Sequence, residues 1–469
     1  MNGLDFDTIA SATGGRWVIE PGADDPAPVG VAIDTRVLHR GQTFVAFVGE
    51  RVDGHGYLDK AQALRAGLCI VTQVGKVPDG FGVPTLVVDD PVKAMTAMAT
   101  LWRSLLKATV IGVTGSNGKT TTTRMIHAVL SQSGSSWVSS KSHNNAIGVP
   151  MSILNAPLDA EYVIFELGTS SPGEIQQRAA LVQPDIAIIT SIGRAHLEEL
   201  DSIQGVCTEK ASILKHTNRL AIVPSGVLDD VIQELDLKCS VEPMRRDRIG
   251  VVELGERSVA FDFDGYRFSV PVPGEHNASN AAMAVLVGRA CGMNDADIAV
   301  GLEQATLPEM RLDRVEIPTR TDPIVVYNDA YNANPDSTRA ALAFFESLQT
   351  KANKVVILGD MLELGKATDA EHASLLTDLN LGVGGVRRIV LVGPALAKAG
   401  GSRPNVEIFP AIDDHAMTEI ARSIEPGAVV LLKGSRGMGL ERLVYILINR
   451  HTPFAGPGRG LRAEDTNGS

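Results

Sequence analysis

The sequence has few cysteines and aromatic residues, and it lacks any long run of basic or apolar residues. Its 4 cysteines are spread along 469 residues, and no two of them form a Cys-x-x-Cys pair. That spacing disfavours a zinc site or a disulfide framework and is typical of a reducing compartment. Residues Met1–Asp7 show no basic region followed by an apolar stretch. We therefore predict no signal peptide and a cytoplasmic location.

Charge and hydropathy exclude further classes of protein. Lys and Arg number 43 against 55 Asp and Glu, which gives a net charge of −12. An acidic chain without a basic run is a poor candidate for binding nucleic acid or a membrane surface. No apolar stretch is long enough to span a bilayer, so we expect no membrane insertion. The length and the 44% of hydrophobic residues predict two to four globular domains, and we expect a monomer.

The most informative stretch runs from Val110 to Thr121. An apolar run that suits a buried strand is followed by a glycine-rich turn, and a helical pattern begins directly after it. Such a turn makes an anion site, because backbone N–H groups and the helix dipole face it. Lys119 would reach the outer phosphates of a nucleoside triphosphate, and the Thr120 hydroxyl would bind Mg²⁺. The residues predicted to bind the nucleotide phosphates are Gly115, Ser116, Asn117, Gly118, Lys119, Thr120 and Thr121.

The glycine spacing differs from the usual phosphate loop. The usual pattern has a glycine five residues before the Gly-Lys pair, where this chain has Val113. Its glycines are instead Gly112, Gly115 and Gly118. The alternative interpretation is a fortuitous glycine turn ahead of a helix. The upstream strand, Lys119 and the pair of threonines favour a variant phosphate loop.

Strand and helix patterns predict an α/β protein of three domains. Around the phosphate loop, short apolar runs alternate with helical segments such as Ser202–Lys215, which indicates a mostly parallel sheet covered on both faces. Gly250–Val272 breaks this pattern and contains Asp264-Gly265, a hairpin signal. The last third alternates again and predicts a second doubly wound unit. The predicted ranges are a small α/β domain over 1–85, a nucleotide-binding domain over 86–312, a second α/β domain over 313–455, and a disordered tail over 456–469.

Single residues in the nucleotide-binding domain have a functional and a structural interpretation. Glu166 ends a strand that follows the phosphate loop and would reach Mg²⁺, unless it only caps a helix or faces solvent. His196 lies in a loop after another strand, where most histidines are surface residues. Lys210 reads as a solvated helix residue beside Glu209. Arg311 precedes the second α/β domain and could stabilise charge during phosphoryl transfer, although solvated linker charges are commoner.

Polar residues at helix starts and strand ends are further candidates. Asn277 and Asn280 open a helix and could cap it, or could bind an adenine edge through their donor and acceptor groups. Asp329 follows an apolar strand and could hold ribose hydroxyls, with an Asx turn as the alternative. Asp34–Arg36 and Asp53–His55 fall at strand ends, where polar groups can face a ligand.

Together these stretches resemble the Mur ligases of peptidoglycan synthesis, from about Ile9 to Ile448. The two C-terminal stretches are the most specific, because sibling ligases carry different residues there. They are similar to the branch of the family that joins D-alanyl-D-alanine to UDP-N-acetylmuramoyl-tripeptide. The stretches that carry the resemblance are Asp34–Arg36, Gly49–His55, Gly115–Thr121, His143–Pro150, Gly274–Asn280, Asp329–Pro335 and Gly359–Gly365.

The resemblance implies a fold, an activity and cofactors. The fold would be a small α/β N-terminal domain that binds the UDP-MurNAc-peptide, a central P-loop mononucleotide-binding domain and a C-terminal Rossmann-like domain that binds the incoming dipeptide and nucleotide. The activity would be ATP-dependent, ADP-forming ligation through an acyl phosphate, making the UDP-MurNAc-pentapeptide precursor. The cofactors would be ATP and two Mg²⁺ ions, with Lys210 carbamylated by CO₂ so that it becomes an anion.

The resemblance also assigns residues by role. The catalytic set would be Lys119, Glu166, His196, Lys210 and Arg311. The metal set would be Thr120, Glu166, His196 and the Lys210 carbamate. Besides the phosphate loop, ATP would contact Asn277, Asn280, Arg311 and Asp329. The peptide substrates would contact Thr35, Arg36, Asp53, His55, His143, Asn144, Asn145, Tyr331, Asn332, Asn334, Asp360 and Leu364. One departure is the run Thr169–Ile175, where the family usually has bulkier or amide residues, which leaves the roles of Thr169 to Ser171 open.

Three rival functions remain to be compared. A sibling ligase that adds the diamino acid carries an Asp-Asn-Pro-Arg element, whereas Lys433–Gly439 has none. Folylpolyglutamate-type ligases share the phosphate loop but would lack the N-terminal UDP-substrate domain. A non-catalytic nucleotide-binding module would not need Lys119, Thr120, Glu166, His196 and Lys210 together. The third residue of the substrate peptide, lysine or diaminopimelate, stays open.

Overall fold

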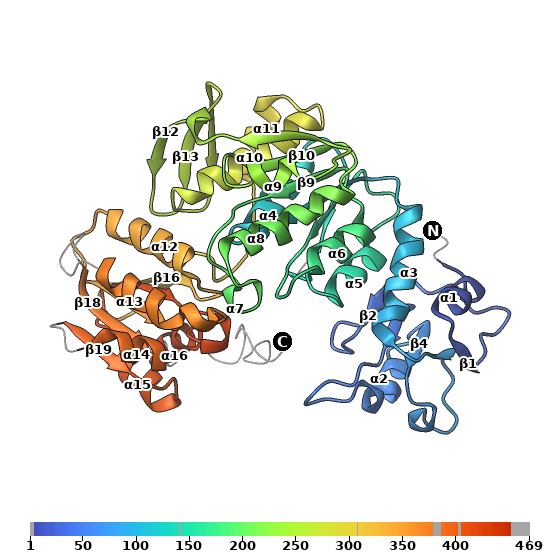
Figure 1. Ribbon diagram of the computed structural model, residues 1–469. Helices are drawn as coiled ribbons and strands as arrows, with labels where there is room; N and C mark the ends of the chain where they lie inside the picture. The colour runs from blue at the N-terminus through green and yellow to red at the C-terminus, as the bar shows by residue number, and fades with distance from the viewer. Residues whose placement is uncertain (1–3, 140–141, 307, 379–385, 402–404, 452–469) are drawn as a thin grey trace. The chain divides into compact units, whose positions relative to one another are not determined.

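The computed structural model describes residues 4–139, 142–306, 308–378, 386–401 and 405–451. It confirms the predicted mixed α/β class (Figure 1). The chain forms two compact units, and the predicted tail over 456–469 lies outside the described residues. No helix in the described part of the chain is long and apolar enough to cross a bilayer. The first unit comprises residues 1–254, 258–271 and 276–307, and the second comprises 255–257, 272–275 and 308–469.

The first unit begins with a five-stranded sheet in the order β1-β5-β4-β3-β2. Only β1 runs antiparallel to its neighbour, and the other pairs are parallel. Every residue of β4 is buried, as expected of a parallel strand that is covered on both faces. The elements are α1 (Phe6–Thr13), β1 (Arg16–Ile19), β2 (Val31–Ala32), β3 (Thr43–Val45), α2 (Leu58–Ala63), β4 (Leu68–Val71) and β5 (Thr85–Val87).

The central sheet has six strands in the order β11-β10-β9-β6-β8-β7, all of them parallel. The chain passes from β8 on one side of β6 to β9 on the other. The carboxyl end of β6 is therefore a topological switch point, where open α/β sheets bind ligands. The strands are β6 (Thr109–Thr114), β7 (Ser136–Val138), β8 (Tyr162–Glu166), β9 (Ile186–Ile189), β10 (Leu220–Pro224) and β11 (Ser240–Met244).

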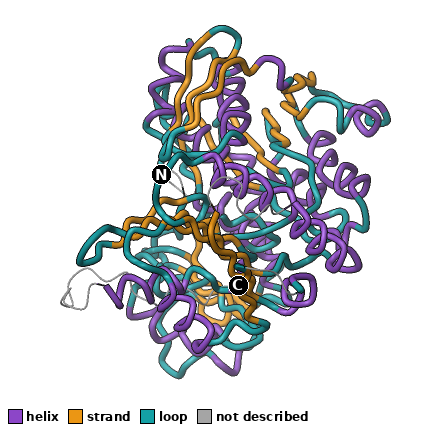
Figure 2. The backbone as a smooth tube through the Cα atoms, turned by 90° about the vertical axis from the view of Figure 1, so that its left-hand side faces the viewer, coloured by secondary structure: helices purple, strands orange, loops and turns teal. Residues whose placement is uncertain are grey.

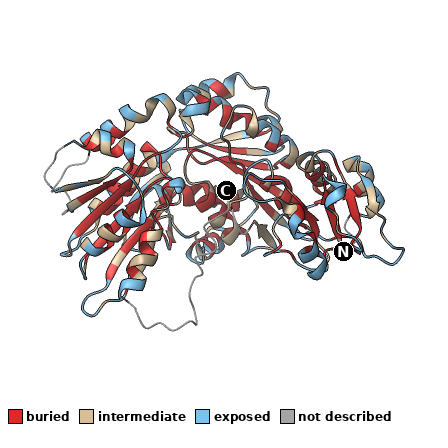
Figure 3. Cartoon of the chain, turned by 90° about the horizontal axis from the view of Figure 1, so that it is seen from below, coloured by how far each residue is buried: buried red, intermediate tan, exposed pale blue. Residues whose placement is uncertain are grey.

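Two groups of helices accompany this sheet. Helices α3, α5 and α6 contact one another, whereas α4 packs against α10 and α11. Helices flank the strands in Figure 2, and Figure 3 shows the strands buried with exposed residues on helices and loops. The helices are α3 (Pro91–Leu105), α4 (Lys119–Leu130), α5 (Gly148–Asn155), α6 (Glu174–Val182), α7 (Leu197–Leu200), α8 (Ile203–Ala211), α9 (Asp229–Gln233), α10 (His276–Ala290) and α11 (Asp295–Glu303).

The predicted hairpin is confirmed in a three-stranded antiparallel sheet of β12 (Ile249–Leu254), β13 (Val259–Phe263) and β14 (Tyr266–Val270). Asp264 and Gly265 make its turn with φ values of 50° and 83°, and left-handed backbone at both positions suits a two-residue hairpin.

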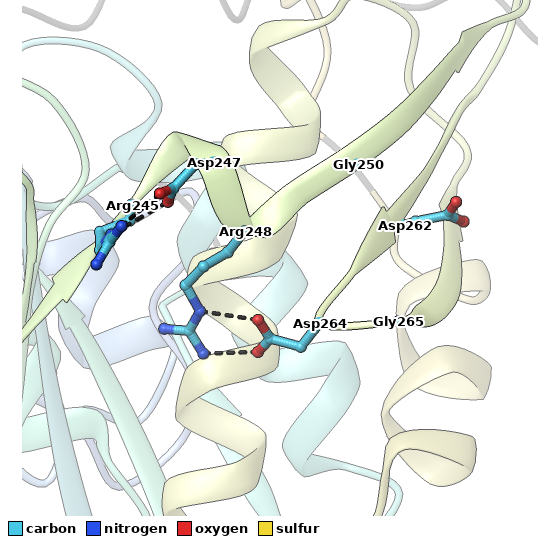
Figure 4. Close-up of a pocket in the computed structure, with 7 residues that line it drawn as sticks. All are labelled: Arg245, Asp247, Arg248, Gly250, Asp262, Asp264 and Gly265. Atoms are coloured by element: carbon cyan, nitrogen blue, oxygen red, sulfur yellow. Dashed lines mark hydrogen bonds and ion pairs between the residues drawn. The ribbon is translucent and has the colours of Figure 1, made fainter.

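A polar hollow of about 550 Å³ lies on this sheet (Figure 4). Its charges are paired, because Arg248 donates to Asp264 at 2.6 and 2.9 Å and Arg245 pairs with Asp247. Arg248, and after it Arg289, lowers the pKa of Asp264 to about 2. The hollow is lined by Arg245, Asp247, Arg248, Gly250, Asp262, Asp264 and Gly265, none of which was predicted to be functional.

The second unit confirms the predicted second α/β unit. Its sheet has the order β15-β16-β20-β17-β18-β19, in which only β15 is antiparallel to its neighbour. The strands are β15 (Asp313–Ile317), β16 (Ile324–Asp329), β17 (Lys354–Gly359), β18 (Val386–Val392), β19 (Val406–Phe409) and β20 (Val429–Lys433). The helices are α12 (Pro335–Ser347), α13 (Thr368–Asp378), α14 (Pro394–Gly400), α15 (Asp414–Ser423) and α16 (Arg442–His451).

Candidate functional site

The predicted phosphate loop is a turn between β6 and α4 at the switch point of the central sheet. β6 ends at Thr114, and α4 begins at Lys119. Gly118 is the N-cap of α4, with a left-handed φ of 83° and no side-chain hydrogen bond to the cap. An anion at this N-terminus would face the first backbone N–H groups of α4. The strand-turn-helix arrangement is the one that a phosphate loop requires.

Close contacts explain why two of the loop positions are glycine. A Cβ on Gly118 would overlap Asn280 Oδ1, and a Cβ on Gly115 would overlap Thr190 Oγ1. Gly115 has a φ of 149° and Gly118 one of 83°, both of which glycine adopts easily. The displaced glycine pattern thus follows from the packing of Asn280 and Thr190 against the loop.

The segment after β9 holds the loop in place. Ser116 N–H donates to Ser191 O at 2.9 Å, and the Ser116 hydroxyl donates to Gly193 O at 3.1 Å. Asn117 N–H donates to Ser191 Oγ at 2.8 Å, and the Thr190 hydroxyl donates to Asn117 O. Sequence reasoning missed Thr190–Gly193 as part of the site. The available signal was a Thr-Ser pair directly after a buried strand that lies beside β6.

Lys119 and the threonines line the start of α4. The Lys119 ammonium donates to Gly115 O at 2.7 Å, so it lies across the turn. Thr120 and Thr121 are buried, and Thr120 Oγ1 lies 3.2 Å from Ser142 Oγ. Both the ammonium of Lys119 and the hydroxyl of Thr120 are therefore at the start of α4.

Glu166 lies on the strand next to the phosphate loop. Val113 of β6 pairs with Glu166 of β8, which brings the carboxylate to the same edge of the sheet as the loop. Its Oε1 accepts from Asn144 Nδ2 at 2.7 Å, and Gly168 N–H donates to Asn144 O at 2.9 Å. Asn144, predicted to contact substrate, thus also orients Glu166. Its assignment to the substrate stays a prediction.

Lys210 is buried, with 1% of its surface exposed. This burial excludes the interpretation of Lys210 as a solvated helix residue. Burial and the neighbouring charge of Lys119 lower the pKa of the Lys210 ammonium well below its ordinary range, while Glu209 opposes the shift. A buried amine that lies within the field of another cation favours its neutral form.

Glu209, the residue before Lys210, holds the start of α6. Its carboxylate accepts from Gly173 N–H at 2.6 Å and from Ile175 N–H at 2.7 Å. The Thr169 hydroxyl lies 3.1 Å from Glu209 Oε1 and donates to Ser171 O at 2.9 Å. The Thr169–Ile175 run that departs from the family pattern is therefore packed around Glu209. Sequence reasoning did not predict this role for Glu209.

The other predicted residues of the first unit make local contacts, and their roles stay predictions. Asn280 Nδ2 donates to Asn277 Oδ1 at 2.9 Å, both residues are buried at the start of α10, and Asn280 lies beside Gly118. His196 caps α7 with a left-handed φ of 55°. His143 Nδ1 lies 3.0 Å from Ser139 Oγ, and Asn145 Oδ1 accepts from Gly148 N–H at 2.8 Å.

The N-terminal candidates form a polar cluster around a buried histidine. His55 Nδ1 lies 2.7 Å from Asp53 Oδ1, and His55 Nε2 accepts from Thr72 N–H at 3.1 Å. Lys76, and after it His55, lowers the pKa of Asp53 below its ordinary range. These bonds assign the proton of the imidazole to Nδ1.

Thr35 is buried in the N-terminal sheet region, whereas Arg36 is exposed and pairs with Asp34 at 2.7 Å. The roles predicted for Thr35, Arg36, Asp53 and His55 in binding substrate stay predictions.

In the second unit, Lys433 contacts two of the residues that were predicted to bind the nucleotide or the dipeptide, Asp329 and Asn332. This lysine is 2% exposed on its side chain, and its ammonium lies 2.9 Å from Asp329 Oδ2. It also donates to the backbone oxygen of Asn332. The Arg311 guanidinium lies 4.2 Å from the centroid of the Tyr331 ring. Asp329, Asn332, Tyr331 and Arg311 are therefore brought together by the end of β20 and the segment before β15.

Three other candidates of this unit have structural partners. Asn334 forms a capping box with Ser337 at the start of α12. Asp360 accepts from Ala395 N–H at 2.9 Å and Leu396 N–H at 2.8 Å, so it caps α14. Leu364 is buried. Their contacts to a dipeptide stay predictions.

The donor groups fit Mg²⁺ better than a transition metal. Over the part of the chain that the structure describes, no group of three or more His, Cys, Asp or Glu side chains is placed to hold a metal ion. Mg²⁺ in nucleotide enzymes is usually held by one or two carboxylates or hydroxyls together with substrate phosphates. Glu166 and Thr120, which lie at the same sheet edge as the loop, suit that kind of site.

Comparisons with known proteins match one family, the Mur ligases, along most of the chain. The Mur ligase middle domain family matches residues 113–288, and the Mur ligase, glutamate ligase domain family matches residues 311–436. UDP-N-acetylmuramoyl-tripeptide–D-alanyl-D-alanine ligase of Bacillus subtilis is 33% identical over 440 residues, which cover 89% of this chain and 93% of that relative.

Solved structures show the same fold. A crystal structure of MurF from Acinetobacter baumannii is 29% identical, with a TM-score of 0.79 over 95% of this chain and 98% of that one. MurF from Thermotoga maritima, solved in complex with ADP, is 23% identical, with a TM-score of 0.74 over 91% of this chain and 98% of that one.

The fit of Gly118 against Asn280 can be tested with a matched pair of variants. Gly118 and Gly173 are both helix N-caps, with φ values of 83° and 84°, but nothing lies within 4 Å of a Cβ on Gly173. We expect Gly118→Ala and Gly173→Ala each to lose about 1 kcal/mol of stability from the left-handed backbone. Only Gly118→Ala should also lose nucleotide affinity, by about tenfold or more. Thermal unfolding and calorimetric titration with ATP would measure both effects, and equal losses of affinity would contradict the account.

Proposed function

This chain belongs to the Mur ligase family, and we propose that it joins D-alanyl-D-alanine to UDP-N-acetylmuramoyl-tripeptide with hydrolysis of ATP to ADP and phosphate. It is thus an ATP-dependent peptide ligase that makes the pentapeptide precursor of peptidoglycan. The observation that carries the proposal is the turn at Gly115–Thr121 between β6 and α4, in a chain that is similar to such a ligase over 89% of its length. We further propose that it acts as a monomer in the cytoplasm.

The first step activates a carboxylate, which is a poor electrophile by itself. An oxygen of the terminal carboxylate of the tripeptide forms a bond to the γ-phosphorus of ATP, the bond from that phosphorus to the β–γ bridging oxygen breaks, and ADP leaves. Negative charge spreads over the phosphoryl oxygens. The backbone N–H groups at the start of α4, together with Lys119 and Arg311, would neutralise it. Lys119 would exchange its bond to Gly115 O for one to phosphate.

We propose that further residues bind the nucleotide. The buried Asn277 and Asn280 would contact the adenine side, and Asp329 would hold the ribose hydroxyls. Thr120 and Glu166 would hold Mg²⁺, with His196 near the metal region. When bound, two Mg²⁺ ions would supply positive charge to the phosphoryl oxygens.

The state of Lys210 supports the proposal of a carbamate at this position. An amine reacts with CO₂ only in its neutral form, and burial together with Lys119 lowers the pKa of Lys210. Carbamylation would convert this buried neutral amine into an anion within the field of Lys119. The oxygens of the carbamate would then serve as a metal ligand. The neighbouring carboxylate of Glu209 would not compete for this role, because it accepts hydrogen bonds from the start of α6.

In the second step, the free amine of D-alanyl-D-alanine attacks the carbonyl carbon of the acyl phosphate. A C–N bond forms, the nitrogen loses a proton, and phosphate leaves with the former carboxylate oxygen. No side-chain nucleophile is needed. We assign the dipeptide to Tyr331, Asn332, Asn334, Asp360 and Leu364. We assign the UDP-linked substrate to Thr35, Arg36, Asp53, His55, His143, Asn144 and Asn145.

Phosphate release tests the function directly. With ATP and UDP-N-acetylmuramoyl-tripeptide, we expect release to require D-alanyl-D-alanine, and mass spectrometry should find the ligated pentapeptide. A matched reaction would contain the dipeptide precursor and a diamino acid, the substrates of the sibling ligase. The proposed function would be overturned if phosphate were released only in that second reaction, or if its release did not depend on D-alanyl-D-alanine.

The carbamate can be tested with an exposed lysine as control. We expect Lys210→Ala to lower kcat at least about a hundredfold, a loss comparable to removal of one charge-stabilising group. Lys215→Ala, which changes an exposed lysine five residues away, should keep the activity. The wild-type rate should also fall in CO₂-depleted buffer and recover with bicarbonate. A wild-type rate that is independent of bicarbonate, with no added mass of CO₂ on the Lys210 peptide, would contradict carbamylation.

A further inference from the structure

The sheet of the second unit has its own topological switch point, at the carboxyl end of β20. This strand lies between β16 and β17. The connections from β16 to β17 and from β17 to β18 cross the sheet in one direction, whereas the connection from β19 to β20 returns in the other. Because crossovers between parallel strands are right-handed, the helices of these two sets lie on opposite faces.

The helices that follow the three central strands agree with this division. Helix α13, after β17, contacts α12 and α14, whereas α16, after β20, contacts α15 of the returning connection. The loops after β17 and β20 therefore diverge toward opposite faces of the sheet. Open α/β sheets bind their ligands where neighbouring loops diverge in this way.

A buried serine joins the loops at this edge of the sheet. Ser435 follows β20, is 3% exposed, and accepts from Leu362 N–H at 2.9 Å through its hydroxyl. The same hydroxyl donates to Ala333 O at 3.3 Å, and Ser435 N–H donates to Asp360 O at 3.2 Å. The loops after β16, β17 and β20 are therefore held in one arrangement by Ser435.

Burial decides which side chains of the loop after β17 face outward. Asp360 is 3% exposed, and its carboxylate accepts from two N–H groups at the start of α14. Leu364 is 1% exposed. Leu362, between them in the sequence, is 44% exposed. The loop thus presents the apolar side chain of Leu362 to a ligand, and not the two residues that the sequence predicted.

Leu362 lies next to a cation of the loop after β20. Its N–H is bonded to Ser435, and its Cδ1 would lie 3.0 Å from a Cβ at Gly437. Leu362 therefore contacts the residues on both sides of Arg436, whose side chain is 43% exposed. An exposed apolar group and an exposed guanidinium are neighbours at the switch point.

The guanidinium of Arg436 is anchored at one corner. Its Nη1 lies 3.2 Å from Oε1 of Glu441, a carboxylate with 8% of its side chain exposed, and 3.1 Å from Met310 Sδ. Arginine carries five N–H donors on three nitrogens in a rigid plane. An anchor at Nη1 therefore fixes this plane and is compatible with a second carboxylate at another edge of it.

The terminal residue of D-alanyl-D-alanine has the complementary chemistry. Its methyl group and its carboxylate are bonded to the same carbon atom, so their complement is an apolar group beside a cation. Arginine suits a carboxylate because its fork of N–H donors matches the two oxygens. Recognition at this end of the dipeptide also leaves the reacting amine, at the other end, free to attack.

We propose that Arg436 binds the terminal carboxylate of the incoming dipeptide and that Leu362 packs against the methyl group of the same residue. These two residues take the place of Asp360 and Leu364 in recognition of the dipeptide. The inference rests on the proposed function, since it names contacts of the substrate that the second step consumes.

The role of Arg436 is tested by removing the charge from either partner. For the wild type, replacing D-alanyl-D-alanine by its C-terminal amide should raise KM about tenfold or more, in the range of a charge-assisted hydrogen bond. Arg436→Gln should raise the KM for the dipeptide by a similar factor and keep kcat within about twofold. This variant should then use the dipeptide and the amide equally well, because the cation that distinguishes them is gone.

Arg442→Gln is the matched control for this substitution. The side chain of Arg442 is also 43% exposed and also lies near a carboxylate, that of Asp414 at 3.3 Å. This variant should keep both the KM of the wild type and the full penalty for the amide. Thermal unfolding shows whether each variant folds.

The role of Leu362 is tested with a dipeptide that lacks the terminal methyl group. The wild type should prefer D-alanyl-D-alanine to D-alanylglycine by about fourfold in kcat/KM, as expected for one buried methyl group. Leu362→Ala should lower this preference to less than about twofold. Leu105→Ala removes a leucine of α3 that is equally exposed, at 44%, and should leave the preference unchanged.

Three results would overturn the inference. The first is a wild type that uses the amide as well as the dipeptide, a comparison that needs no variant. The second is an Arg436→Gln variant that keeps the tenfold preference for the dipeptide, since another group would then bind the carboxylate. The third is a Leu362→Ala variant with the wild-type preference for the methyl group. Failure of the proposed function is distinct, because a wild-type chain that does not join D-alanyl-D-alanine fails before any of these comparisons.

Discussion

The packing of Asn280 and Thr190 against two glycines is the constraint on which the site depends. A Cβ at Gly118 or Gly115 would overlap these side chains, and Gly118 is the N-cap from which α4 begins. The hydroxyls and backbone of Thr190–Gly193 hold that turn from the neighbouring strand end. Because β6 lies between β8 and β9, the same edge also receives Glu166. An anion site and a carboxylate for a metal therefore follow from one strand order.

Buried lysines in the two units have different partners, and this difference fits different tasks. Lys433 is paired with Asp329, so its charge is compensated and it serves to fix a loop. Lys210 is next to Glu209 in sequence, but that carboxylate accepts from the start of α6. Adjacent residues on a helix point in different directions, which allows α8 to anchor α6 with one residue and present an amine with the next. The ion pair of Lys433 therefore stabilises one loop conformation. The lowered pKa of Lys210 instead favours a neutral amine that can react.

The sequence predicts the phosphate loop, the alternation of strands and helices and the Asp264-Gly265 hairpin, because each depends on residues close together in the chain. It does not predict the support of the loop, since Ser116 and Gly193 are 77 positions apart. The predicted helix Ser202–Lys215 is found as α8 over Ile203–Ala211 and continues as a 3₁₀ helix over Ser212–His216, a change of helix type that the sequence does not predict. Motif residues such as Asn145, Asn334 and Asp360 illustrate another limit. Side chains that suit ligands also suit helix caps, and only the folded chain shows that these three cap α5, α12 and α14.

The central claim is that a peptide carboxylate, and not water, takes the γ-phosphoryl group that the loop holds. An isotope experiment tests it most directly. UDP-N-acetylmuramoyl-tripeptide labelled with ¹⁸O in its terminal carboxylate would be ligated with unlabelled ATP and D-alanyl-D-alanine, and the released phosphate analysed by mass spectrometry. The account predicts one ¹⁸O atom in each phosphate, because the carboxylate oxygen bonds to phosphorus and leaves with it. Phosphate without label would show that water attacked the γ-phosphorus and would contradict the account.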